Sequence, residues 1–201
     1  MPMADEQAVR AVLTKYEPVL FAATHGGWDD WRALGLGGRL LFQARSRACV
    51  VYDFIVQRAM AALAEDPAVR VLRRDETVKF VFHDTVALRF KKANEKGLGS
   101  NIRTQATLGF VEQQLELPDV PNVHKVEVVY VLNDLQTRVE QVLVAARDGD
   151  VCLWNYDVKV DVGAQVIPMP ARLPDQPSGG QGARTKLRAV DEGMKRDTRE
   201  K

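Results

Sequence analysis

The sequence predicts an α+β domain in which a mostly antiparallel sheet of about six strands carries two N-terminal helices and one inserted helix packed on it. Three observations support this class. Two early segments repeat apolar residues at three- and four-residue steps, six later segments alternate apolar and polar residues, and most links between the later segments are short. Short links favour antiparallel pairing, because a parallel pair needs a long crossover. The composition, 46% hydrophobic and 27% charged with a net charge of +1, is that of a globular domain.

The two N-terminal helices are expected over residues 5–23 and 39–65. In the first, Val9, Leu13 and Leu20 fall on one face, and Gly26-Gly27 is expected to end the helix or open a loop. The second ends at Asp66-Pro67, because the residue before a proline leaves the helical region. It carries a stripe of mostly small residues that favours close packing: Leu41, Ala44, Ala48, Val51, Ile55, Ala59 and Ala62.

Strands are expected at 69–73, 78–83 and 86–92, and again near 124–132, 138–147 and 151–161. The dipeptide Asp148-Gly149 indicates a hairpin, since both residues tolerate positive φ. Between the two groups of strands, Ser100 or Asn101 can cap a helix that runs to about Leu115.

Residues 1–167 are expected to form the single domain, and residues 168–201 a Pro/Gly-rich linker with a charged, disordered tail that buries too little apolar surface to fold. No signal peptide and no apolar run of roughly 20 residues is visible, so we expect a cytoplasmic protein without a membrane span. Cys49 and Cys152 lie in apolar stretches and are expected to be buried free thiols. No metal site or cofactor is expected, because the histidines and cysteines do not cluster.

The stretch from Val86 to Gln105 is the most unusual, because basic residues follow one another through a strand, a glycine loop and a helix start. Backbone N–H groups at a helix start attract anions, and basic side chains add to this attraction. The sequence therefore predicts a surface for an anion, a nucleic acid or a protein partner. Its candidate residues are Arg89, Lys91, Lys92, Lys96, Asn101, Arg103 and Gln105. The alternative is an edge strand whose lysines only prevent aggregation.

Asp53 is predicted to need a partner, because no basic residue lies three or four positions away on its helix. Arg89 is the candidate, in a buried ion pair that ties helix to sheet. A catalytic or partner-binding carboxylate is the alternative. Asp157 and Lys159, with Asp148 or Asp150 upstream, also fit the Asp-x-Lys end of a metal nuclease, but the spacing is common and equally fits a solvated strand face.

The stretches 45–58, 86–92 and 101–105 resemble small bacterial and phage proteins encoded beside regulators that combine a helix-turn-helix domain with an ImmA/IrrE-type metallopeptidase-like domain. Such pairs resemble toxin–antitoxin modules. The resemblance covers roughly residues 40–160 and implies a toxin-like component that is neutralised by binding a cognate antitoxin. It supplies no catalytic residues, so whether the chain is an enzyme stays open. The residues themselves leave a rival hypothesis, a nucleic-acid-binding or nucleic-acid-acting protein that uses the basic stretch.

Overall fold

The computed structural model describes residues 3–39, 41–74, 77–94, 97–100, 105–113, 115, 117, 120 and 122–160. The described strands form one six-stranded sheet with the spatial order β1-β2-β3-β4-β5-β6, which confirms the α+β class. The strands are β1 (Val69–Arg74), β2 (Thr77–Phe82), β3 (Val86–Lys92), β4 (His124–Leu132), β5 (Val139–Asp148) and β6 (Val151–Asp157). The helices are α1 (Glu6–Leu13), η1 (Thr14–Tyr16), α2 (Glu17–Ala33), α3 (Gly35–Arg39), α4 (Ala44–Leu63) and α5 (Gln105–Val111).

The sheet is antiparallel at every neighbouring pair except β3 and β4. These two run parallel, with Val86 opposite His124 and Lys92 opposite Tyr130. Residues 93–123 connect them as a crossover that contains α5. A parallel connection of this length is the usual one, since the chain must return along the whole strand before it pairs again.

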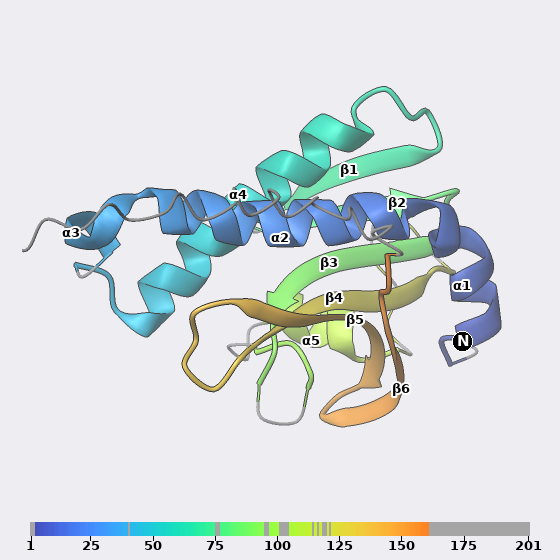
Figure 1. Ribbon diagram of the computed structural model, residues 1–201. Coiled ribbons are helices and arrows are strands. Elements are labelled where there is room, and N and C mark those ends of the chain that lie inside the picture. Colours follow the sequence, from blue (N-terminus) through green and yellow to red (C-terminus); the bar gives the residue numbers. More distant parts are fainter. Residues whose placement is uncertain are drawn as a thin grey trace, which may run out of the picture. The chain divides into compact units, whose positions relative to one another are not determined.

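Both faces of the sheet are covered (Figure 1). Helices α1, α2 and α4 lie on one face, where they pack against a large apolar core that includes Phe80, Phe82, Leu88 and Phe90. Helix α5 lies on the other face, with Phe110 in a smaller cluster that also includes Leu117 and Val120. This two-sided burial explains why β3 is almost continuously buried although its sequence alternates.

The first predicted helix is divided into α1, η1 and α2, and α2 continues to Ala33 through both glycines of Gly26-Gly27. The prediction that these glycines end the helix is wrong, because they serve a helix–helix contact. A Cβ on Gly27 would lie 2.5 Å from Cγ1 of Ile55 and 2.7 Å from its backbone nitrogen. The absent side chain thus lets α4 approach α2 closely. Pro18 is tolerated because it lies in the first turn of α2.

The second predicted helix begins five residues later than expected, at Ala44. Its middle stripe is confirmed, since Val51, Ile55 and Ala59 are each 0% exposed. Leu41 precedes the helix and is exposed. Ala44 and Ala62 are also exposed, which corrects both ends of the predicted stripe.

Both cysteines are free, but Cys49 is exposed and Cys152 is half-buried. The expectation of two buried thiols is therefore wrong. Within the described residues, no helix has both the length and the apolar character that a membrane crossing requires. The predicted linker and tail at 168–201 lie outside the described residues.

Candidate functional site

Arg89 does not contribute to an exposed basic surface, because its side chain is only 2% exposed. Its Nε and Nη2 donate to Oε1 of Glu127 at 3.0 and 2.6 Å. Its guanidinium also lies 4.2 Å from the ring centroid of Phe110 in α5. The prediction that Arg89 faces an external anion is therefore wrong, since its charge is already paired inside the fold.

The two neighbouring lysines lie on opposite faces of β3, as strand alternation requires. Lys91 shares the face of Arg89 and is half-buried; burial and then Arg89 lower its pKa. Lys92 lies on the helix-covered face, where burial and then Arg47 of α4 lower its pKa. The structure therefore separates two residues that the sequence placed in one patch.

The rest of the predicted basic patch cannot be placed. Lys96, Asn101 and Arg103 lie outside the described residues. Gln105 begins α5, but its side chain is also outside the described part. The single strand–loop–helix surface stays a prediction for these four residues.

Asp53 is exposed on α4, and the predicted Asp53–Arg89 ion pair does not form. Val51 and Ile55 point from the same stretch of α4 into the core, so Asp53, between them, faces solvent. Arg89 pairs instead with Glu127 of the adjacent strand. The Asp53 carboxylate, which we predicted to tie α4 to the sheet, therefore lies on the surface.

Glu127 is the centre of a buried polar network between the sheet and the crossover. Besides Arg89, it accepts the backbone N–H of Gly99 at 3.1 Å and lies 3.7 Å from Nη1 of Arg147. Arg147 also donates to the carbonyl of Gly99 at 3.0 Å. The network therefore joins β3, β4 and β5 to the loop at Gly99, and the charges compensate one another where water is excluded.

Lys125 and Gln113 extend this network to α5. The ammonium of Lys125 donates to the carbonyls of Gly109 (3.0 Å), Glu112 and Leu115 (2.7 Å), which lie at and just after the end of the helix. Gln113 donates from Nε2 to the carbonyls of Lys125 and Arg147. The contacts of Lys125 satisfy carbonyls that the end of α5 leaves open, and those of Gln113 join α5 to strands β4 and β5. Burial lowers the pKa of Lys125 to about 8.

Sequence reasoning missed Glu127, Lys125 and Arg147. A signal was present, because Lys125 and Glu127 alternate with Val126 and Val128 in a strand whose other face is apolar. Their pairing with Arg89 depends on the β3–β4 register, in which Arg89 lies opposite Glu127. No local pattern specifies that register.

Two of the acidic residues near β6 make structural contacts, whereas Asp157 and Lys159 are exposed. Asp148 accepts the backbone N–H of Gln113 at 3.0 Å, and Asp150 pairs with Arg147 at 3.0 Å. Among the described residues, no group of three or more His, Cys, Asp or Glu side chains could hold a metal ion. The arrangement therefore gives the metal-nuclease interpretation no support.

A different surface exposes large apolar side chains close to basic ones. We define the apolar–basic end as Leu34, Leu41, Phe42 and Leu135 together with Arg45, Arg47, Lys92 and Arg138. Its apolar side chains are 44%, 83%, 40% and 80% exposed, in that order. They come from the end of α2, the link before α4 and the turn between β4 and β5.

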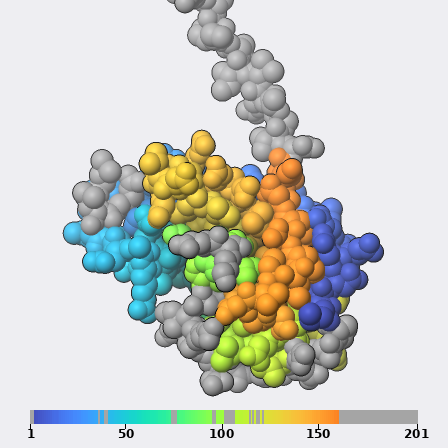
Figure 2. Space-filling view, turned by 90° about the horizontal axis from the view of Figure 1, so that it is seen from below, coloured from blue at the N-terminus to red at the C-terminus, as the bar shows by residue number. Residues whose placement is uncertain are grey.

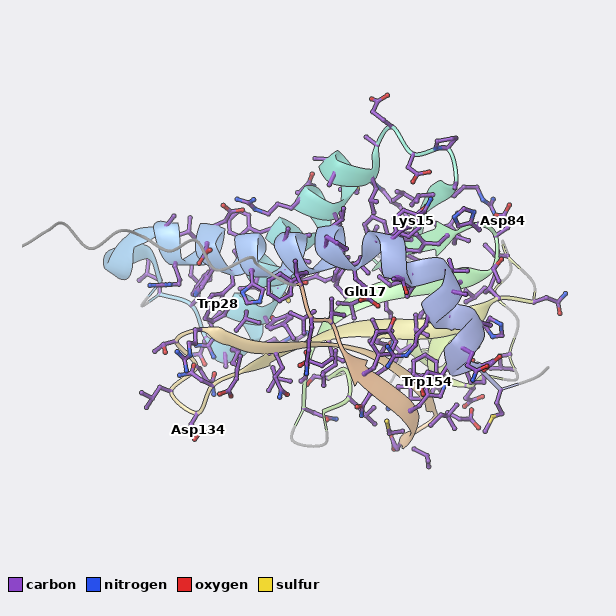
Figure 3. All side chains as sticks on the ribbon, turned by 45° about the vertical axis from the view of Figure 1, so that its right-hand side comes forward. Lys15, Glu17, Trp28, Asp84, Asp134 and Trp154 are labelled. Atoms are coloured by element: carbon purple, nitrogen blue, oxygen red, sulfur yellow. The ribbon has the colours of Figure 1, made fainter. Side chains whose placement is uncertain are left out.

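Three contacts bring these segments together. The rings of Trp31 and Phe42 lie 5.5 Å apart, Nε1 of Trp28 donates to the carbonyl of Thr137 at 3.2 Å, and Arg47 donates to the side chain of Gln136. Figure 2 shows the start of α4 and the β4–β5 turn on one side of the molecule. In Figure 3, Trp28 lies between α2 and the sheet, and Asp134 marks the tip of the turn.

No protein-family model, no curated protein and no solved structure matches this chain. Fold and site define its class as an α+β domain with a mixed sheet, a crossover fixed by buried charges and one exposed apolar–basic end.

Proposed function

We propose that this chain is the toxin-like component of a two-component bacterial or phage module, of the toxin–antitoxin or phage-defence type, and that it is neutralised by binding a cognate protein partner at the apolar–basic end. The resemblance of residues 45–58, 86–92 and 101–105 supports the type of module. The exposure of Leu41 (83%) and Leu135 (80%) supports the choice of binding surface. Large aliphatic side chains gathered at one exposed place are typical of a surface that a partner covers.

The same surface is well anchored, which supports a role in recognition. Phe42 rests against Trp31, and the β4–β5 turn is held to α2 and α4 through Trp28 and Arg47. A surface fixed before association loses less conformational entropy when the partner binds.

Co-expression with the product of the adjacent gene tests the proposal. We expect this chain alone to slow growth, the pair to restore it, and the two proteins to co-elute in size-exclusion chromatography. The double variant Leu41→Ser with Leu135→Ser should weaken binding roughly 10- to 100-fold, because it removes apolar burial at the contact. Val151→Ser is the matched control, since Val151 is 65% exposed on β6 and belongs to no part of the end.

The proposal fails if the two proteins elute separately and this chain alone leaves growth unchanged. It also fails in its choice of surface if the double variant and Val151→Ser bind equally well.

Nucleic-acid binding is the second candidate function, and the observation that favours it is the group of cations Arg45, Lys92 and Arg138 on the same end. Contacts to phosphates make retention steeply salt-dependent. DNA and RNA retention would be measured at low and moderate salt for the wild type and for Arg45→Glu with Lys92→Glu. Retention that ignores both salt and substitution removes this candidate. The exposed leucines favour a protein partner over a nucleic acid, because phosphate groups make no apolar contact with leucine side chains.

A further inference from the structure

We infer that the partner segment that binds the apolar–basic end carries carboxylate side chains beside aliphatic ones. This inference rests on the proposed function and adds the chemistry of the partner. Three features of the end support it, namely unpaired cations, the charge at the start of α4 and the position of the exposed leucines.

Among the described residues, no ion pair joins a cation of this end to an acidic side chain. In the part of the chain that the structure describes, Arg45, Lys92 and Arg138 have no carboxylate within 4.0 Å, although Asp134 lies in the same turn as Arg138. Five exposed cations elsewhere on the described surface do have such partners, whereas Arg73 on β1 does not. The pairs are Arg10 with Glu6, Lys15 with Asp66, Arg32 with Asp29, Arg58 with Asp30 and Arg70 with Asp84.

The start of α4 adds to this local positive charge. Its cap residue, Gln43, makes no side-chain capping bond, and the first turn holds no acidic residue but includes Arg45 and Arg47. Cations are unfavourable at a helix N-terminus, because the helix dipole is positive there. Helix α1 shows the opposite arrangement, with Asp5 as its cap and Glu6 in the first turn. External carboxylates beside α4 would lower this electrostatic cost.

The leucines decide between classes of acidic partner. Leu41 and Phe42 directly precede the basic turn of α4, and Leu135 lies three residues before Arg138. A partner that covers this end must therefore desolvate aliphatic groups and neutralise cations in the same contact. A protein segment with mixed acidic and aliphatic side chains does both, whereas a phosphate backbone does only the second.

The test measures association of the adjacent gene's product with the full chain at 50 mM and 500 mM salt. The variant is Arg45→Glu with Arg138→Glu, and both side chains are exposed, so the fold should be retained, which a thermal unfolding curve checks. At 50 mM salt we expect association about tenfold slower than for the wild type. At 500 mM salt the difference should fall below about twofold, because the charges are screened. Arg73→Glu is the control; Arg73 lies on β1 and contacts Sδ of Met60 rather than a carboxylate.

Each outcome bears on the inference. Slower association for the double variant alone supports it. Equal association for both variants and the wild type overturns it while leaving the proposed function intact. Absence of binding by the wild type overturns both. Loss of the complex after nuclease treatment also overturns it, since a nucleic acid would then supply the negative charge.

Discussion

Glu127 occupies an unusual electrostatic position. Among the described residues it is the only buried acidic side chain, whereas four basic side chains are buried: Lys79, Arg89, Lys125 and Arg147. Two of these, Arg89 and Arg147, lie within 4.0 Å of its carboxylate. The side chain therefore compensates charges from two neighbouring strands at once.

Replacing Glu127 by alanine should destabilise the fold by about 3–5 kcal/mol, because it leaves buried arginine charge uncompensated. Urea unfolding at neutral pH measures the change. Glu140→Ala is the matched control, since Glu140 is an exposed acid on β5, and its loss should cost less than about 0.5 kcal/mol. Equal losses for the two variants would contradict the role assigned to Glu127.

Lys125 predicts a pH dependence of stability. Its pKa is about 8 in the folded protein and 10.5 when exposed, so between these values the unfolded chain binds more protons than the folded chain. The free energy of unfolding therefore rises with pH in this window, by up to about 1.4 kcal/mol per pH unit. Denaturant unfolding of the wild type and Lys125→Met should show a difference in stability that shifts in favour of the wild type from pH 8 upward. A difference that is constant with pH would refute this.

At the scale of elements, the contact between α2 and α4 depends on a missing side chain. Gly27→Ala should destabilise by about 1–3 kcal/mol, although alanine favours a helix, because the new Cβ would meet the backbone of Ile55 at 2.7 Å. Gly109→Ala is the control, since a Cβ at Gly109 in α5 would have nothing within 4 Å. We expect it to be neutral or stabilising by up to about 1 kcal/mol. Thermal unfolding compares the two, and a harmless Gly27→Ala would mean that the helices do not need this close approach.

In the crossover, the predicted helix is present, but the parallel pairing that the crossover creates was not predicted. The sequence predicts a helix between the two groups of strands, and α5 is present there. It does not predict that the link makes β3 and β4 parallel, because short links dominate the rest of the chain. The parallel register then brings Arg89 beside Glu127, and this pairing removes the centre of the predicted basic patch.

For the whole molecule, the described core lies within residues 3–160. A chain of residues 1–167 should therefore keep the free energy of unfolding of the full chain to within about 0.5 kcal/mol, because residues 168–201 contain few large apolar side chains. A chain that ends at Asp150 should lose at least about 4 kcal/mol, since it lacks β6 and the buried Tyr156 and Val158. Urea unfolding of the three chains distinguishes these outcomes. A large loss on removing 168–201 alone would show that the domain extends further than predicted.

The sequence by itself determined the number of strands and the order of helical and extended segments, because the periods of 3.6 and 2 are local properties of a chain. The tertiary structure decided which individual side chains are buried, exposed or paired. It buried Arg89, exposed Asp53, carried α2 through Gly26-Gly27 and left Leu41 in solvent. The reason is physical, because burial and ion pairing depend on which residues contact one another across the sheet and between helices. Those contacts join segments that are far apart in the chain.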